Sequence, residues 1–371
     1  MTGSVGRKTL VRKTNESRPV GRGSAQTTWS TMGEQLATGG WKKLHQEAIV
    51  VDGTCPLLRR PEFVDWYIEG GATAVAPTVG SAASAGETLR NLGAWLHLIS
   101  QRNDLLLVKK AKDIAAAKST GRLGLIFHFQ GADPVENDLN LVDVYKEIGV
   151  GMIQLTYNVK NRVGDGCEER TDAGLSRFGV DLIKRLNDAR IVVDCSHTGY
   201  RTTLDAIKYS TRPVVFSHAN PRMVHGSPRN ILDDQIKAVA DTGGLVGMNG
   251  FPAFVAKRRK PTLDDFIDHM DYCVDMIGVD HVALGIDYYE GQHPVAPRQE
   301  ALRMYRASIA SGRWSAQSYP PPPYHYPSGI ETPKTLPNLT KRLLERGYKA
   351  ADIRKVLGEN WVRVFKSVWG Q

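Results

Sequence analysis

The stretch Ile191–Asn220, IVVDCSHTGYRTTLDAIKYSTRPVVFSHAN, contains two apolar runs separated by an amphipathic segment. The runs Ile191–Cys195 and Pro213–Ser217 are rich in valine, which favours extended strands. The segment Thr202–Tyr209 between them has a helical pattern. Apolar runs joined by a helix are typical of parallel strands that are buried on both faces. This stretch therefore predicts one strand–helix–strand unit of a parallel α/β fold.

The same alternation continues along most of the chain. Eight strands with intervening helices favour a (β/α)8 barrel of the TIM type over an open sheet. A doubly wound open sheet is the alternative, but no GxGxxG motif follows the first strand-like run. The six further runs are Ala48–Asp52, Ala74–Thr78, Leu123–Phe129, Met152–Thr156, Leu245–Asn249 and Val282–Gly285.

The 371 residues divide into a tail and one domain. Residues 1–40 are polar, basic and nearly free of apolar side chains, which predicts a disordered tail. Residues 41–371 are expected to form a single barrel domain. An irregular excursion is expected at about 288–332, either over one end of the barrel or as a partner-binding arm. Two closing helices are expected at Thr332–Gly347 and Ala351–Trp369.

Charge and composition restrict the partners and the compartment. The net charge of +9 is concentrated in the tail, so it does not indicate a nucleic-acid partner. The four cysteines show no CxxC spacing, which argues against a disulfide framework and fits a reducing cytoplasm. We find neither an apolar run of about 18 residues nor a secretory signal. The sequence therefore predicts a cytoplasmic protein without a membrane partner.

Polar side chains stand where the predicted strands end. In a (β/α)8 barrel the carboxyl-terminal ends of the strands meet at one face and form the active site. We therefore expect these side chains to gather there. They are Asp52, His128, Gln130, Tyr157, Asn158, Asp194, His197, His218, Asn220, Asn249 and Asp287.

Two histidines at the ends of neighbouring strands, His197 and His218, suit a divalent metal. Asp287 could take a proton from metal-bound water and deliver it to a leaving amine. Each residue also has a structural alternative, since a buried histidine often serves only the core and an aspartate often caps a turn. We expect His128 to satisfy local backbone groups. Arg229 is either a surface residue or a clamp for a substrate carboxylate.

Several motifs together resemble those of the membrane (renal) dipeptidase family of the amidohydrolase superfamily. They are LTYN, GLSRFG, VDCSH, FSHAN, SPRNILDDQI, LGID and the C-terminal PNLTKRLLERGYKAADIRKVLGENWVRVF. The resemblance runs from about His45 to Phe365. It implies a (β/α)8 barrel of the metal-dependent hydrolase type. It also implies two zinc ions bridged by a glutamate, and hydrolysis of dipeptides.

Four residues match functional positions of that family. By this resemblance, His197 and His218 match the histidines of the second metal position. Arg229 matches the arginine that holds the substrate carboxylate or the tetrahedral intermediate. Asp287 matches the acid/base aspartate.

Other positions depart from the family pattern. The family's DGHND-like motif supplies a histidine and an aspartate to the first metal, whereas DGTCP here places Thr54 and Pro56 at those positions. Gln130 stands at the bridging glutamate, and Tyr157 stands at the histidine that steadies the substrate oxyanion. Cys55 lies one residue away from the ligand positions, so strand alternation would turn it away from a metal.

These departures predict at most one divalent metal. We expect zinc, held by His197 and His218 together with Gln130 or Asp287. The expected function is a dipeptidase-like, metal-dependent hydrolase that cleaves a C–N bond in a small carboxylate-bearing substrate.

In that reaction Asp287 and Tyr157 are the expected catalytic residues. Arg229 and Asn158 are expected to bind the small anionic substrate. One alternative is a non-hydrolytic enzyme on the same barrel, such as a decarboxylase, isomerase or lyase. The other is a non-catalytic binding protein. A homodimer is compatible with the resemblance.

Overall fold

A computed structural model describes residues 39–370 of the chain. Most of the predicted tail, residues 1–38, lies outside this described part. None of the helices within residues 39–370 combines the length and apolar character needed to cross a membrane.

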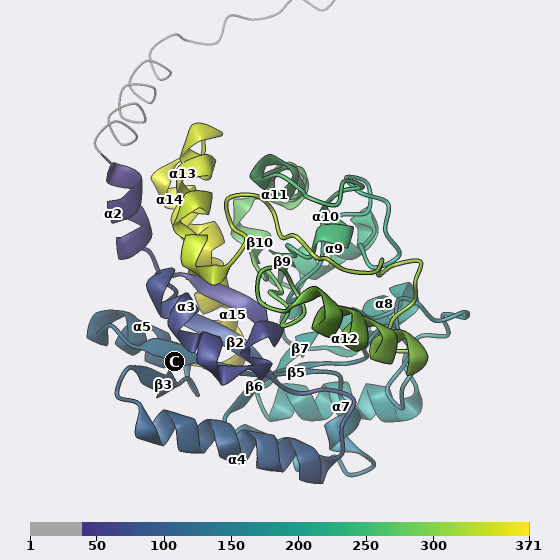
Figure 1. Cartoon of the computed structure of the whole chain (residues 1–371). Coiled ribbons are helices and arrows are strands. Elements are labelled where there is room, and N and C mark those ends of the chain that lie inside the picture. Colours follow the sequence, from purple (N-terminus) through teal and green to yellow (C-terminus); the bar gives the residue numbers. More distant parts are fainter. Residues whose placement is uncertain (1–38, 371) are drawn as a thin grey trace, which may run out of the picture.

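Parallel strands close into a ring at the centre of the molecule (Figure 1). The pairing runs from β1 through β10, β9, β8, β7, β6 and β5 to β2, and a β1–β2 pairing closes the ring. This confirms the predicted (β/α)8 barrel. The ring strands are β1 (Val51–Cys55), β2 (Ala74–Gly80), β4 (Leu123–Leu125) with β5 (Phe127–Gln130), β6 (Val150–Gln154), β7 (Val192–Asp194), β8 (Val214–Phe216), β9 (Leu245–Met248) and β10 (Val282–Leu284).

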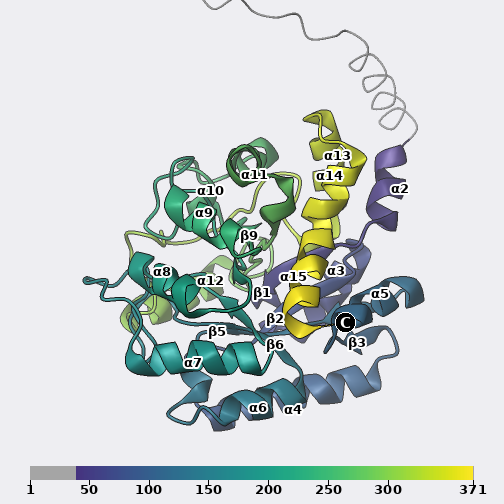
Figure 2. The same ribbon diagram turned by 180° about the vertical axis from the view of Figure 1, so that it is seen from behind.

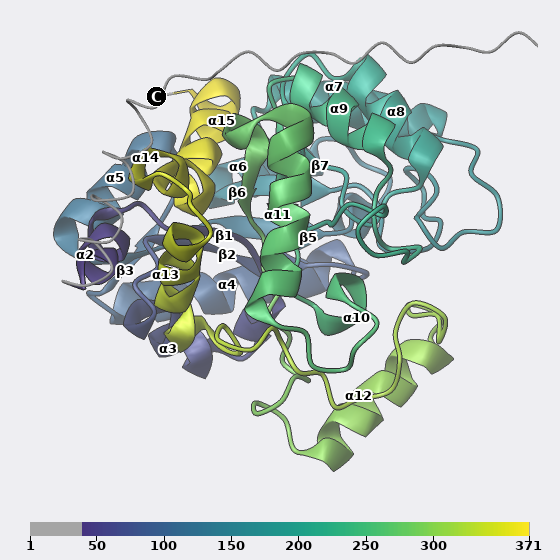
Figure 3. The same ribbon diagram turned by 90° about the horizontal axis from the view of Figure 1, so that it is seen from above.

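Helices surround the ring, as the three views show (Figures 1, 2 and 3). They are α2 (Gly40–Glu47), α3 (Val64–Glu69), α4 (Ala85–Gln101), α5 (Ala111–Thr120), α6 (Leu141–Ile148), α7 (Arg177–Asp188), α8 (Tyr200–Tyr209), α9 (Asp233–Asp241), α10 (Pro252–Val255), α11 (Leu263–Ile277), α12 (Arg298–Ala310), α13 (Pro337–Glu345), α14 (Ala350–Arg354) and α15 (Asn360–Trp369). Short 3-10 turns precede or join several of them, among them η1 (Pro56–Arg59), and a π-helical turn, Lys355–Glu359, joins α14 to α15.

The first strand lies further along the chain than predicted. It was expected to end at Asp52, whereas β1 continues to Cys55. Its register is set by β2, because Val51 pairs with Ala74 and Cys55 pairs with Pro77. As a result, Asp52 is enclosed within the barrel wall and Thr54 belongs to the strand. The sequence also gave no sign of β3 (Leu105–Leu107), a short strand that pairs with β4 outside the ring.

The excursion predicted to be irregular contains the 13-residue helix α12. Figure 3 shows this helix standing at the edge of the molecule, away from the helices that flank the ring. Ala301 is the fully buried residue of α12. A helix that buries so little of one face has no strong apolar periodicity, which is why the pattern of the sequence did not reveal it.

The helix α15 fills one end of the barrel with aromatic side chains. The Trp361 and Phe365 rings stack with centroids 5.2 Å apart, and Phe365 and Trp369 stack at 4.0 Å. They pack against residues that begin strands, such as Ala74 and Leu245, and therefore occupy the amino-terminal end. The carboxyl-terminal end, which carries the predicted functional residues, remains as the other opening of the barrel.

A glycine makes room for this aromatic filling. A Cβ added to Gly53 would lie 2.2 Å from Cζ2 of Trp361. The indole Nε1 of Trp361 donates a hydrogen bond of 2.8 Å to the carbonyl of Leu284. The close approach of an indole to the β1 backbone therefore requires glycine at this position.

Candidate metal and substrate site

The histidines that follow β7 and β8 meet at the carboxyl-terminal end of the barrel. The Nε2 atoms of His197 and His218 are 2.9 Å apart, and both side chains are buried. His197 has a φ of 64° and Asp287 a φ of 63°, a region that side chains larger than glycine seldom adopt. Such strained residues often occur at functional sites.

Both imidazoles are oriented by hydrogen bonds to their Nδ1 atoms. The Nδ1 of His197 is 2.6 Å from the Oδ1 of Asn158. The Nδ1 of His218 is 2.7 Å from Ser217 Oγ, which in turn donates to Asp194 Oδ2 at 2.5 Å. Because both Nδ1 atoms face acceptors, this network assigns a lone pair to each Nε2, and the two lone pairs converge.

The electrostatics of the site favour neutral histidines. Burial lowers the pKa of both His197 and His218 well below the ordinary value, and the positive charge of Arg229 lowers it further. Neutral imidazoles with converging Nε2 atoms are suited to bind a divalent cation.

Asn158 lies behind His197 instead of facing the cavity. Its Nδ2 donates to the carbonyl of Arg313 at 2.9 Å and to the Tyr319 hydroxyl at 3.0 Å. Since its Oδ1 is bonded to His197, both ends of this amide have protein partners. Asn158 therefore orients a histidine, and its contact with the substrate stays a prediction.

Gln130 contacts the same histidine pair from the side of β5. Its Nε2 is 3.4 Å from the Nε2 of His218. The side chain also lines the cavity at the barrel mouth. The structure therefore brings the three predicted metal-binding side chains, Gln130, His197 and His218, into one place.

The positions that the resemblance assigns to a first metal are occupied by a different network. Thr54 Oγ1 is 3.0 Å from Nδ1 of His128, and Nε2 of His128 is 3.1 Å from Asp194 Oδ2. His128 thus bonds to two buried side chains, which corrects the expectation that it serves local backbone groups. The thiol of Cys55 packs in the main core and faces the carbonyl of Asp52 at 3.8 Å. Within residues 39–370, no three His, Cys, Asp or Glu side chains are grouped so as to hold a metal.

The buried carboxylate of Asp194 joins this network to His218. Burial alone would raise its pKa, but the hydrogen bond and the charge of His128 hold the pKa well below the usual range. The backbone amides of Ser196 and Ser217 each donate to its Oδ1 at 2.9 Å. Asp194 is therefore an ionised and fully bonded anchor for the Ser217–His218 pair.

Asp287 follows β10 and faces the cavity. Its Oδ2 accepts a hydrogen bond of 3.1 Å from Asn249 Nδ2, and its carbonyl accepts one from the Tyr326 hydroxyl. Burial raises the pKa of its carboxyl to about 7, against the opposing effect of Arg229. A carboxyl group with this pKa can both take and return a proton near neutral pH.

Arg229 is only 2% exposed, so it is not a surface residue. Its Nη2 donates to the carbonyl of His218 at 3.1 Å, while its Nε has no hydrogen-bond partner. It lines a second cavity of about 140 Å³, which His197 also lines. A buried guanidinium with an unused donor is suited to hold an anionic group.

Tyr157 covers His197 from the loop after β6. The two rings stack with centroids 4.1 Å apart. The Tyr157 hydroxyl accepts a hydrogen bond of 3.0 Å from Trp314 Nε1, and burial raises the pKa of this hydroxyl. Its own proton is therefore retained and available to an acceptor in the cavity.

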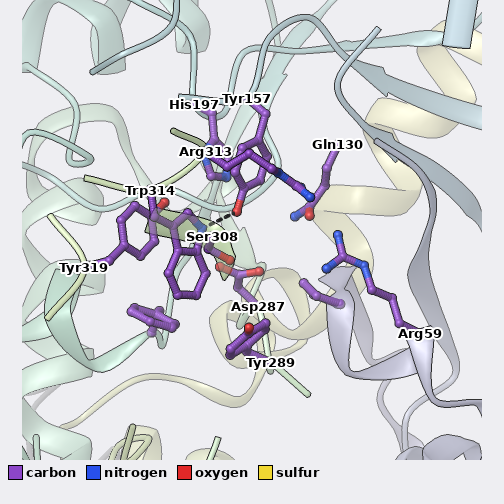
Figure 4. A pocket seen from close by; sticks show the side chains of 12 residues that line it. Arg59, Gln130, Tyr157, His197, Asp287, Tyr289, Ser308, Arg313, Trp314 and Tyr319 are labelled. Carbon is purple, nitrogen blue, oxygen red and sulfur yellow. Dashed lines mark hydrogen bonds between the residues drawn. The ribbon is translucent and has the colours of Figure 1, made fainter. Parts of the chain in front are cut away.

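Side chains of the excursion line the cavity at the barrel mouth (Figure 4). Trp314 and Tyr319 stack at 4.3 Å, and both line a cavity of about 40 Å³ together with Tyr157, His197 and Asp287. Sequence reasoning missed several residues of this lining, namely Arg59, Tyr289, Arg313, Trp314 and Tyr319. The aromatic residues near the proline run were the one available signal, and they did not indicate which end of the barrel the excursion covers.

Comparisons with known proteins agree with the fold and with the resemblance. Residues 68–307 and 323–369 match the family model of membrane dipeptidases, peptidase family M19. An uncharacterized protein of the pqqA 5' region of Klebsiella pneumoniae is 29% identical over 277 residues, 72% of this chain and 90% of that protein. An uncharacterized dipeptidase of Schizosaccharomyces pombe is 28% identical over 289 residues, 76% of this chain and 62% of that protein. A solved amidohydrolase of Pseudomonas aeruginosa superimposes with a TM-score of 0.83 at 34% identity, covering 89% of this chain and 99% of that one.

Proposed function

Because the chain belongs to the membrane dipeptidase family, we propose that it is a metal-dependent hydrolase that cleaves a C–N bond in a small carboxylate-bearing substrate. Membership of a peptidase family supports a hydrolase of the dipeptidase type. The observation that carries the proposal is the pair of Nε2 atoms 2.9 Å apart, with both Nδ1 atoms engaged by acceptors.

The histidine pair fits one divalent metal. The two Nε2 atoms are 2.9 Å apart, so both could reach one ion at zinc–nitrogen distances of about 2.0–2.1 Å. His197 and His218 would hold the ion, and Gln130 would complete its protein ligands, which leaves Asp287 free to act on protons. When bound, such a metal polarises a carbonyl and lowers the pKa of a coordinated water.

A second metal does not fit the residues at the first position. Thr54 and His128 are bonded to each other, and both nitrogens of His128 have partners. Pro56 has no side-chain donor, and Gln130 lacks the negative charge of a bridging carboxylate. We therefore propose a single metal per chain, and zinc as its identity because the imidazole ligands suit it.

The residues around the pair have distinct roles in hydrolysis. Asp287, with its pKa of about 7, takes a proton from the attacking water and returns it to the leaving amine. Arg229 holds the carboxylate of the substrate from the neighbouring cavity. The Tyr157 hydroxyl donates to the oxygen that develops negative charge. Asn158 and Ser217 keep the two imidazoles in the required orientation.

Substrate entry requires the excursion to move. A cavity of about 40 Å³ is far smaller than the roughly 300–1,000 Å³ of ligand pockets. The stacked pair Trp314 and Tyr319 closes it, and the indole is tied to Tyr157. We propose that these two aromatic residues withdraw when a dipeptide-sized molecule binds.

The proposal is tested by measuring metal per chain after reconstitution with zinc, together with amine release from dipeptides and N-acyl amino acids. We expect about one zinc per chain and hydrolysis that stops in Asp287→Asn. An exposed-residue variant, Asp188→Asn in α7, serves as the control and should keep both properties. Two metals per chain would contradict the single-site assignment. Absence of metal binding would instead favour non-hydrolytic chemistry on this barrel or a binding role.

A further inference from the structure

Two arginines in the barrel mouth have no role in the reaction described above. Arg59 belongs to η1, the turn directly after β1, and Arg313 follows α12 in the excursion. Although they come from distant parts of the chain, both line the cavity that contains His197, Gln130 and Asp287. In Figure 4 the guanidinium ends of both arginines point toward Gln130.

The charge of these arginines is only partly compensated. Arg59 Nη1 lies 3.1 Å from Oε1 of Glu290. Arg313 donates to Ser81 Oγ at 3.2 Å, and its guanidinium carbon lies 4.9 Å from the centre of the Tyr157 ring. Neither a hydroxyl nor an aromatic face neutralises a guanidinium. Within residues 39–370, no carboxylate lies within 4 Å of the Arg313 guanidinium to form an ion pair.

The two guanidinium groups border the position at which the resemblance would place the first metal. Pro56 and Gln130 stand at that metal's ligand positions and line the same cavity as Arg59 and Arg313. The two arginines therefore place positive charge beside a position whose residues do not support a dication. Guanidinium groups recognise carboxylates, so this charge is suited to bind an anion.

We propose that Arg59 and Arg313 form a binding site for a second carboxylate of the substrate. This inference rests on the proposed function and narrows its substrate class to dicarboxylates, such as dipeptides with an acidic first residue. One carboxylate lies at Arg229 and the other at the Arg59–Arg313 pair. His197 lines both cavities and therefore lies between the two anion positions.

The size of the cavity agrees with such a group. About 40 Å³ exceeds the roughly 10–15 Å³ needed for one water molecule. Trp314 and Tyr319 border the same cavity and would withdraw to admit the rest of the substrate. Guanidinium groups bind carboxylates through two parallel N–H donors, so a planar carboxylate facing Arg313 uses donors that Ser81 leaves unoccupied.

Binding of glutarate and of its monoamide tests this site independently of catalysis. Titration calorimetry on the full chain should show glutarate binding at least tenfold more tightly than the monoamide. Arg313→Met should reduce glutarate affinity at least tenfold and leave the monoamide unaffected, and Arg313→Lys should reduce it less. Arg306→Met, an exposed arginine of α12, is the matched control and should bind like the natural protein. Melting temperatures of all variants establish that they are folded.

The second test compares kcat/KM for two dipeptides that differ only in the charge of the first side chain. We expect kcat/KM for Glu–Ala to exceed that for Gln–Ala at least tenfold, and the ratio to approach one in Arg313→Met. The inference is overturned if glutarate fails to bind, if it binds equally to Arg313→Met, or if the ratio is the same in that variant. If neither dipeptides nor N-acyl amino acids are hydrolysed, the proposed hydrolase is refuted, and the glutarate titration alone decides the anion site.

Discussion

Replacing His128 with leucine should be among the most destabilising single changes within the described barrel. His128 and Asp194 are both 0% exposed, and their side chains approach to 3.1 Å. The contact is a hydrogen bond to an ionised carboxylate, and bonds to charged groups contribute about 1.5–3 kcal/mol. Removing one partner of a buried pair typically costs about 3–5 kcal/mol because the other charge stays uncompensated. Asp194 keeps three hydrogen bonds, from the Ser196 and Ser217 amides and the Ser217 hydroxyl, so we expect a loss of about 3 kcal/mol.

Urea unfolding at pH 7, followed by the fluorescence of the seven tryptophans, measures this loss. His97→Leu changes an exposed histidine of α4 and should alter the free energy of unfolding by less than about 0.5 kcal/mol. The double variant His128→Leu/Asp194→Asn should lose less than the sum of the single losses, because it leaves no unpaired charge. A loss below about 1 kcal/mol for His128→Leu, or strict additivity, would refute the reasoning.

The pH dependence of the loss has a defined sign. His128 lowers the pKa of Asp194, and a carboxyl with a lowered pKa stabilises the folded state above its unfolded pKa of about 3.9. That stabilisation disappears as the pH falls through the folded pKa. The difference between the natural protein and His128→Leu should therefore persist from pH 7 to 5 and shrink below about pH 4.

Three further outcomes are expected. Asp287→Asn should lower kcat at least 100-fold. In the natural enzyme, kcat/KM should fall about tenfold per pH unit below about pH 7, because the carboxyl of Asp287 becomes protonated there. A flat profile of kcat/KM from pH 5 to 8 would exclude Asp287 as the base. Gly53→Ala should lower the free energy of unfolding in urea by about 1–3 kcal/mol, because its Cβ would meet Trp361 at 2.2 Å. Adding Trp361→Phe to Gly53→Ala should recover part of that loss. Equal stability of the natural protein and Gly53→Ala would contradict the steric account. His197→Ala and His218→Ala should each reduce the zinc content from about one per chain to near zero, and a chelator should lower the melting temperature of the natural protein only.

The barrel and part of its site follow from local patterns in the sequence. Valine-rich runs spaced by amphipathic segments predict strands and helices directly, and His197, His218 and Asp287 stand next to such runs. Residues that end parallel strands must gather at one face, so their meeting could be predicted without knowing any distance.

The remainder of the site depends on contacts between distant segments. Arg313 reaches the cavity because a loop after an exposed helix crosses the barrel mouth, and no periodicity encodes that path. The His128–Asp194 contact joins strands β5 and β7, which are not neighbours in the ring. The role of Asn158 depends on the 2.6 Å distance to His197, which motif position alone cannot distinguish from a substrate contact.

The aromatic filling of the barrel has a consequence for synthesis of the chain. The indole of Trp369 bonds to the carbonyl of Gly151, a residue 218 positions earlier. At about 5–20 residues per second, a ribosome needs roughly 10–40 s to cover that interval. Until then the apolar inner-wall residues that have already been synthesised, first Met152 and later Leu245, have no aromatic residues to cover them. Nascent chains stalled before residue 361 should therefore bind chaperones that recognise apolar surface, and release them once α15 has emerged from the ribosome.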